Sequence, residues 1–455
     1  MESDLERRTF HFFCKRTVGI LSGIFNPTFW TRLVLQAAHH EPAIRHAVIA
    51  LGALHERSEV GSRDESSIFA MQQYGKAIRC LVKPIQEKQK QAADVVLITC
   101  VIFVSFETMR GRLGAAISHI EGGVKIISEL QPGTEPAETW SISTIPYAES
   151  SILNPIFIRL DKQACEISSG RKRLLLNQIL VDKASGYHDD IPLIFASLEQ
   201  ARNSLDHIRT FAMRFVESAA SQPSFSDPVK RALTLEVLKN LTFVKLQQWS
   251  SAFDSFTKNS AGFDVAGQVA IHVLEMHRIV TGVVMEVDED RSFADGTVWD
   301  QYEPQFESIV SHATSITELH LASCVREGRK RSTFYLDEGV ANPLFFVAGT
   351  CRDGALRRKS IELLRVMDWQ EGIMHTSLAA QIAERFMSIE EEDLVGGEGF
   401  LRASEVPGEN RLAGMEVRWV TDRSVHLSYN RMGRRMIGGD GYEGGKVVVE
   451  EWMEW

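Results

Sequence analysis

Residues 42–57 of the chain read PAIRHAVIALGALHER, and their spacing of apolar side chains indicates an α-helix. The apolar residues recur at intervals of three and four: Ile44, Val48, Leu51 and Leu54. This spacing places them on one helical face. Pro42 suits a first helical turn, where its missing N–H needs no partner. The stretch therefore predicts an amphipathic helix that ends near Arg57 and turns its apolar face toward a core.

Helical periodicity continues over most of the chain. Further helices are expected at residues 70–84, 92–109, 113–127, 154–167, 193–218, 228–258, 261–285, 304–321, 343–351, 355–366 and 375–391. The second of these is apolar on all sides and should lie at the centre of the protein. Short connections favour antiparallel neighbours. The sequence thus predicts an all-α fold, either an antiparallel multi-helix bundle or a stack of helix pairs.

Composition divides the chain into four parts. Residues 1–130 form a first helical part, and residues 151–395 form the helical remainder. Between them, residues 131–150 are rich in Pro, Ser and Thr, which indicates a long surface loop. Residues 396–455 begin with a glycine-rich stretch and are expected to form a flexible C-terminal segment.

The C-terminal segment also contains a strand pattern. Apolar residues alternate about Asp422 and Arg423, namely Val417, Trp419, Val425, Leu427 and Tyr429. Such alternation about a turn indicates a small β-hairpin. Val447–Val449, with Trp452 and Trp455, either add a strand or dock onto the helices.

Charge and cysteine usage argue against two kinds of site. The 455 residues carry a formal net charge of -10, whereas chains that hold nucleic acid usually show a basic face. Six cysteines are scattered without a CxxC pair: Cys14, Cys80, Cys100, Cys165, Cys324 and Cys351. A thiolate zinc site needs clustered ligands. Free thiols in a reducing compartment are the preferred interpretation.

The sequence shows no sign of secretion or membrane insertion. The first eight residues, MESDLERR, contain no apolar signal core. The most apolar run, Val95–Phe106, holds a dozen residues, whereas a membrane span needs about twenty.

Three groups of histidines were considered as metal ligands or general bases. They are His39 and His40 with His46, His188 beside Asp189 and Asp190, and His272 with His277. None has the i, i+4 spacing that brings two imidazoles to one metal ion from one helical face. Solvated, capping or loop histidines are the preferred interpretation.

Two other motifs match familiar sites only in part. Glu286–Asp290 concentrates four carboxylates, but an EF-hand counted from Asp288 would need glycine and glutamate where Phe293 and Trp299 stand. Gly439–Gly444 has the letters of a dinucleotide fingerprint, but it precedes Lys446–Val449, which is typical of a strand rather than a helix. The sequence therefore predicts no catalytic residue, no metal ligand and no cofactor, and it leaves any effector-binding residues unassigned.

Two basic clusters are expected to be ion-paired or solvated surface. One comprises Arg326, Arg329, Lys330 and Arg331; the other comprises Arg352, Arg357, Arg358 and Lys359. Acidic residues lie near both, and neither is interleaved with the aromatic side chains that bind single strands. The first cluster is also compatible with a nuclear import signal.

Several segments together resemble a known family. Residues 25–30 read FNPTFW, residues 33–36 read LVLQ, and residues 41–56 read EPAIRHAVIALGALHE. They resemble the opening of the regulatory (middle-homology) region of fungal binuclear zinc-cluster transcription factors. Further matching segments follow in order at Tyr74, 77–78, 106–107, 119–123, 159–163, 191–192, 197–198, 201–202, Trp249, 252–254, 343–348, 351–353 and 357–358. The resemblance spans residues 8–393.

The resemblance implies an all-helical module that receives signals, in some members through small molecules, and contacts the transcription machinery. Family members usually begin with six closely spaced cysteines that hold two zinc ions. The sequence starts where that cluster would have ended. Loss of the front part of a longer chain and a natural stand-alone protein both remain open.

These observations favour a regulatory domain of a fungal transcription regulator. It would act through protein partners, with a small-molecule effector between helices as a further option, and would not bind DNA or a membrane itself. The expected location is the nucleus, or the cytoplasm for a stand-alone protein. The alternative is a scaffold of secondary metabolism that binds or transforms a small molecule, so enzymatic activity stays an open but less favoured hypothesis.

Overall fold

The computed structural model confirms the all-α prediction. It describes residues 3–23, 25, 28–60, 65–87, 89–130, 139–141, 143, 145–167, 191–221, 228–260, 262–287, 296–327, 334–392, 394, 399–421, 424–437 and 441–454. The features noted above at residues 188–190, 288–290, 329–331, 396–397, 422–423 and 439–440 lie outside the described residues.

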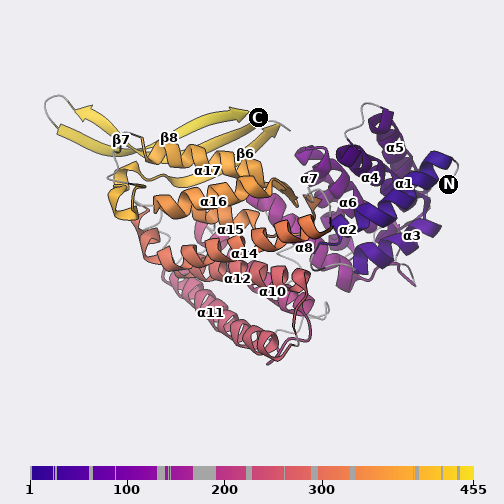
Figure 1. Ribbon diagram of the computed structural model, residues 1–455, viewed down its shortest axis with the longest axis horizontal. Helices are drawn as coiled ribbons and strands as arrows, with labels where there is room; N and C mark the ends of the chain where they lie inside the picture. Colours follow the sequence, from indigo (N-terminus) through magenta and orange to yellow (C-terminus); the bar gives the residue numbers. More distant parts are fainter. Residues whose placement is uncertain are drawn as a thin grey trace.

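The first helices pack into one body, here called the N-terminal unit (Figure 1). Its elements are α1 (Asp4–Phe12), η1 (Phe13–Thr17), α2 (Val18–Leu21), η2 (Phe29–Leu33), α3 (Val34–His40), α4 (Pro42–Val60), α5 (Glu65–Gln86), α6 (Ala93–Met109), α7 (Leu113–Glu129) and α8 (Ser150–Ile167). Helix α6 is buried along nearly its whole length, as its uniformly apolar sequence predicts. Helices α4 and α7 bury their apolar faces in the same core.

Two features of the N-terminal unit differ from the sequence-based prediction. Residues 4–40, to which no helix was assigned, are largely helical, and η1 and η2 are π-helical turns. The wider turn shifts the apolar spacing away from three and four residues. Helix α5 also continues through Pro84 to Gln86, two residues beyond the expected end.

The later helices form a second body, here called the C-terminal unit. Its elements are α10 (Leu198–Ser221), α11 (Pro228–Asn259), α12 (Val265–Glu286), η4 (Thr297–Tyr302), α14 (Glu303–Glu327), α15 (Ala341–Thr350), α16 (Gly354–Met367) and α17 (Thr376–Glu390). Trp249 and Phe253 of α11 are fully buried in its core, as expected. The side chains of Asp264 and Asp353 accept backbone N–H groups at the starts of α12 and α16, which stabilises both helix ends.

Short strands connect segments that are distant in sequence. β1 (Gln91–Ala92) pairs with β2 (Trp140–Ser141), which lies within the expected loop of residues 131–150. β3 (Phe334–Tyr335) pairs in parallel with β4 (Gln370–Glu371), which pairs with β5 (Met374–His375). Two further 3-10 turns, η5 (Ala403–Glu405) and η6 (Gly408–Asn410), follow α17.

The C-terminal segment forms a three-stranded antiparallel sheet. It comprises β6 (Ala413–Thr421), β7 (Ser424–Ile437) and β8 (Gly441–Glu454). The expected hairpin is present, because Val417 pairs with Leu427 and Trp419 with Val425. Residues 447–449 lie in the added third strand, and Gly441–Gly444 pair with β7 instead of opening a helix.

Helix α17 joins the sheet to the helices. One face, with Leu378, Ile382 and Phe386, packs against Val425 and Leu427 of the sheet. Alanines on the opposite face pack into the C-terminal unit. The sheet therefore covers one side of α17, as Figure 1 shows in yellow. Within the described part of the chain, no helix combines the length and the apolar character needed to cross a membrane.

Candidate functional site

A large cleft separates the two helical units. Its volume is about 640 Å³, which lies in the range of small-molecule binding sites. One wall is formed by residues of η1, α2 and α4, and the other by the start of α12, the end of α14 and the segment that precedes α15. The cleft is therefore built from segments that lie far apart in the sequence, from Lys15 to Glu371, and depends on how the two units pack.

Interacting polar side chains line the wall that the N-terminal unit forms. His55 of α4 is almost fully buried, and its Nδ1 lies 3.0 Å from the Thr17 hydroxyl. Its Nε2 lies 3.6 Å from Glu59, which accepts two hydrogen bonds from the Arg16 guanidinium. Burial lowers the pKa of His55, although the Glu59 carboxylate opposes this effect. The ring is thus held in its neutral form beside an already paired carboxylate.

Aromatic side chains line the opposite wall. The Trp369 ring is packed edge-on against both Tyr335 and His320, with ring centres 5.2 and 4.9 Å away. His320 Nε2 also lies 3.5 Å from the Cys324 sulfur, one turn further along α14. Such edge-to-face packing gives a firm apolar surface.

A network of buried ion pairs joins the two units beneath the cleft. Its members are Arg159 and Lys162 of α8, Arg202, Asp206 and Arg209 of α10, and Asp337 and Glu338 before α15. All seven side chains are less than one-fifth exposed. We call this set the ionic network. Asp337 and Glu338 also line the cleft, so the network and the cleft share residues.

Each acid of the segment before α15 has cationic partners. Arg202 donates to both oxygens of Asp337, at 2.6 and 3.2 Å. Glu338 accepts from Lys162 at 2.6 Å and from Arg209 at 3.1 Å. Burial acts to raise the pKa of Glu338, but Lys162 and Arg209 outweigh it and hold the pKa well below its usual range. Glu338 is therefore ionised and ties α8 to α10.

Gly23, which follows α2, lets the chain pass close to this network. Its backbone has a φ of 52°, in the left-handed region that favours glycine. A Cβ atom here would lie 3.3 Å from an Asp337 oxygen. The residue thus sets how closely the N-terminal wall approaches the base of the cleft.

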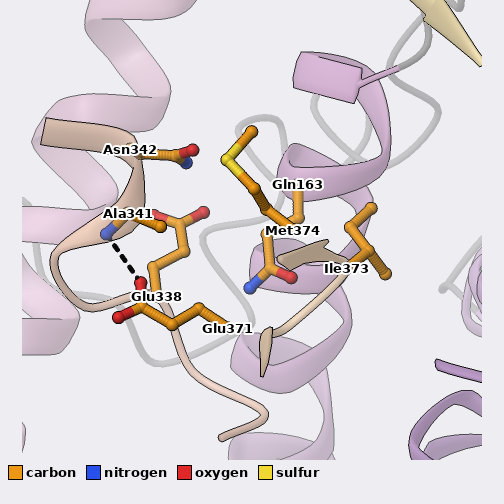
Figure 2. A pocket seen from close by; sticks show the side chains of 7 residues that line it. All are labelled: Gln163, Glu338, Ala341, Asn342, Glu371, Ile373 and Met374. Carbon is orange, nitrogen blue, oxygen red and sulfur yellow. Dashed lines mark hydrogen bonds between the residues drawn. The ribbon is translucent and has the colours of Figure 1, made fainter. Parts of the chain in front are cut away.

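Glu371 fixes the segment that carries the two acids. Its carboxylate accepts hydrogen bonds of 2.8–3.0 Å from the backbone N–H groups of Gly339, Val340 and Ala341, and one of 2.7 Å from the Trp369 indole. Burial raises the pKa of Glu371, while these donors oppose the rise. Figure 2 shows the Glu371 and Glu338 carboxylates around the small pocket beside Gln163, with the bond to Ala341 drawn. Glu371 thereby caps α15 and orients the segment behind Glu338.

His277 of α12 is buried against the ionic network. Neither ring nitrogen has a hydrogen-bond partner, and the ring borders a cavity of about 10 Å³ with Arg202, Arg209 and Glu338. Burial, followed by the charge of Arg209, lowers the pKa of His277 well below its usual value. The ring is therefore neutral in the folded chain.

The structure separates the histidines that stand close together in the sequence. His46 Nδ1 lies 2.6 Å from the Gln73 side chain, and the rings of His39 and His40 contact Phe10 and Tyr147. His272 pairs with His312, Nδ1 to Nδ1 at 2.8 Å, and not with His277. Among the described residues, no group of three or more His, Cys, Asp and Glu side chains has the geometry of a metal site.

The second basic cluster is ion-paired, as expected, but the expectation that it lies on the surface was wrong for two of its arginines. Arg352 and Arg357 are fully buried, and both guanidinium groups lie beside the buried carboxylate of Glu390. Lys359, by contrast, forms the expected exposed ion pair with Glu362. The two arginines therefore stabilise the junction between α16, α17 and β6, where Arg352 also donates to the Leu412 carbonyl.

The ionic network could not be found by sequence spacing, because the hydrogen-bond partners of Asp337 and Glu338 lie 129–176 residues away from them. A weak signal was present. Arg159–Gln163 and Arg202 are among the segments that resemble the fungal family, and the structure brings them together at the base of the cleft. The resemblance assigns them no role; the structure shows charged side chains that join the units.

Comparison with known proteins agrees with the motifs. Residues 8–171 match the family described as "Fungal specific transcription factor domain". The chain is 26% identical over 295 residues to the aspercryptin biosynthesis cluster-specific transcription regulator atnN of Emericella nidulans, a match that covers 62% of this chain and 45% of that protein. It is 26% identical over 147 residues to the transcription regulator lscL of Purpureocillium lilacinum, covering 30% and 35% of the two chains.

The matched segments thus span less than half of the length of either regulator. No solved structure matches the chain. The resemblance predicted from the sequence is confirmed, because residues 8–171 match the fungal specific transcription factor domain.

Proposed function

We propose that this chain is the regulatory region of a fungal transcription regulator, and that a small-molecule effector in the cleft controls its contacts with protein partners. The observation that carries the proposal is the 640 Å³ cleft, whose two walls come from different helical units above a shared ionic network. A ligand that contacts both walls changes the relative stability of alternative packings of the units. The family match supports the regulatory role.

The similarity to the aspercryptin cluster regulator supports a role in secondary metabolism and a nuclear location. The residues of this chain are proposed not to bind DNA themselves, since their formal net charge is -10. An electrophoretic mobility assay at physiological salt should show no retardation of duplex DNA. Sequence-selective retardation that weakens with salt would contradict this part of the proposal.

An exposed apolar stripe supports contact with a protein partner. Its members lie at intervals of three, four and seven residues on one face of α5, namely Ile68, Met71, Ile78, Val82 and Ile85, and are 37–59% exposed. Arg79 and Lys83 border the stripe, and no atom would lie within 4 Å of a Cβ at Gly75 in its middle. This surface suits an amphipathic partner helix with acidic flanks.

The cleft is tested by filling it. Ala266 is an exposed residue in the first turn of α12 and lines the cleft, whereas the neighbouring exposed Gln268 does not. The chain is fused to an unrelated DNA-binding domain, and transcription from a reporter is measured in a fungal host. Ala266→Trp should fix the reporter at one level across growth conditions, while the control Gln268→Trp should respond like the parent chain.

A normal response of the Ala266→Trp fusion, at equal protein abundance, would rule out the cleft as the effector site. Val82→Glu, which places a charge in the α5 stripe, should lower reporter transcription without changing thermal stability, and Gln72→Glu should not. Detection of substrate turnover by the purified chain would favour the alternative of a recruited metabolic scaffold.

A further inference from the structure

The acidic side chains that line the cleft already have hydrogen-bond or ion-pair partners within the chain. They are Glu59, Asp264, Asp337, Glu338 and Glu371. Glu59 binds Arg16, and Asp264 accepts the Gly267 N–H at the start of α12. The other three are held by the ionic network and by the α15 N-terminus, as described above. None of these acids is therefore in need of a cationic ligand.

The positive charge of the cleft is not balanced in the same way. Lys15 of η1 and Arg326 of α14 are exposed on opposite walls, and neither forms an ion pair with another described residue. Val265 and Ala266, the first residues of α12, also line the cleft, where the Asp264 carboxylate already accepts the Gly267 N–H at the helix start. The charge available to a ligand is positive.

The interior of the cleft is apolar. Phe25 and Trp369 are almost fully buried in its lining, which also includes Val269, Val273 and Ile316. A flat ring system buries much area on such a surface at little entropic cost.

We infer that the cleft binds an amphipathic organic anion, whose ring body packs between Phe25 and Trp369 and whose acidic group faces Lys15 and Arg326. The inference rests on the proposed function, because it names the chemical class of the effector. A cationic ligand would meet only acids that already have partners, and would be repelled by the two free cations.

Two probes with the same aromatic body test the sign of this charge. Anilinonaphthalene sulfonate carries one negative charge, and N-phenyl-1-naphthylamine carries none; both fluoresce strongly when they leave water. Binding of each is measured by fluorescence titration of the full chain. The anion should saturate one site with higher affinity than the neutral probe, and its affinity should fall with ionic strength because part of the attraction is screened.

Matched variants locate the site. Lys15→Glu combined with Arg326→Glu should weaken binding of the anion by about tenfold, as expected for two partly exposed charge contacts, and leave the neutral probe unchanged. Lys83→Glu combined with Lys125→Glu makes the same change of net charge at two exposed residues that do not line the cleft, and it should have no effect. Ala266→Trp should remove the site for both probes.

Equal affinity for the two probes, or anion binding that survives either cleft variant, would overturn the inference. These results are separable from failure of the proposed function. Anion binding lost in Ala266→Trp, combined with a reporter that ignores that substitution, would leave the ligand class intact and refute the regulatory role. A reporter that is fixed at one level by Ala266→Trp, together with no binding of the anion to the parent chain, would support the regulatory role and refute the ligand class.

Discussion

The Lys162 ammonium donates a 2.6 Å hydrogen bond to the Glu338 carboxylate, although 176 residues separate the two in the sequence. Both side chains are less than one-tenth exposed, and Arg209 shares the same carboxylate. A buried carboxylate between two cations is stabilising only while all three charges are present. Glu338 therefore holds Lys162 of α8 against the C-terminal unit, beside the pairs that Arg159 forms with Asp206 and Asp337.

Glu338→Gln should lower the free energy of unfolding by about 3–5 kcal/mol, because it leaves Lys162 and Arg209 buried without their counter-charge. Chemical denaturation followed by far-UV circular dichroism measures the loss. Glu384→Gln is the control, since Glu384 forms a half-exposed pair with Arg365 and should cost no more than about 1 kcal/mol. Equal costs for the two variants would contradict a structural role of the ionic network.

The ionic network marks the limit of what spacing in the sequence can show. Apolar periodicity located α4, α6 and α7, because each helix buries a face that is set by its own residues. Asp337 and Glu338 carry no such local sign. Their partners come from α8 and α10, and only the packing of the two units brings them together. The cleft could not be predicted for the same reason.

Where the predicted helices differ from the structure, the cause lies in a few neighbouring residues. The helices before Pro42 were missed because π-helical turns break the expected spacing. The sequence predicts a helix end at Pro84. This proline removes only one backbone donor near the end of α5, so the helix ends two residues later. The hairpin about residues 422–423 was predicted correctly because alternation is also a local property.

The buried His277 should make stability depend on pH. Its folded-state pKa is lowered by burial, whereas the ring takes up a proton below about pH 6.5 in the unfolded chain. The unfolded state then binds more protons, so the contribution of His277 is constant above pH 6.5 and becomes destabilising below it. Lys162, Arg202 and Arg209 face the ring beside Glu338, and their charges reinforce the neutral form.

His277→Leu should therefore reduce the loss of unfolding free energy between pH 7.5 and pH 5.5 by about 1 kcal/mol. Urea denaturation at the two pH values measures this difference. The control His11→Leu replaces an exposed histidine of α1. An unchanged pH dependence in His277→Leu would show that this ring takes up its proton over the same pH range in the folded and unfolded states, and would contradict its burial as a neutral ring.

Adjacent glycines of α7 should respond oppositely to alanine. A Cβ on Gly123 would lie 2.0 Å from the Phe157 ring of α8, whereas a Cβ on Gly122 would have no atom within 4 Å. Gly123→Ala should therefore destabilise the chain by about 1–3 kcal/mol, because α7 and α8 must move apart. Gly122→Ala should stabilise it by up to about 1 kcal/mol. Thermal unfolding measures both, and a similar midpoint for the two variants would contradict the close helix contact.

Cysteine reactivity should follow burial. Burial raises the pKa of both Cys100 and Cys351 to about 12, so almost no thiolate is present at neutral pH. Both should resist iodoacetamide in the native chain and react only after unfolding. The half-buried Cys324 of the cleft should react before either of them. Peptide mass spectrometry over time measures the order, and modification of Cys100 as fast as Cys324 would contradict the packing of α6.

The buried ion pairs between the two units also determine where the chain can be divided into parts that fold alone. The matched family segment ends at residue 171, just after α8, yet Arg159 and Lys162 of α8 face Asp337 and Glu338 far beyond that point. A fragment of residues 8–171 would expose both cations together with the side of α8 that now meets the C-terminal unit. We therefore expect the family segment to be a unit of sequence similarity but not an independently folding unit, with both parts unfolding in one transition.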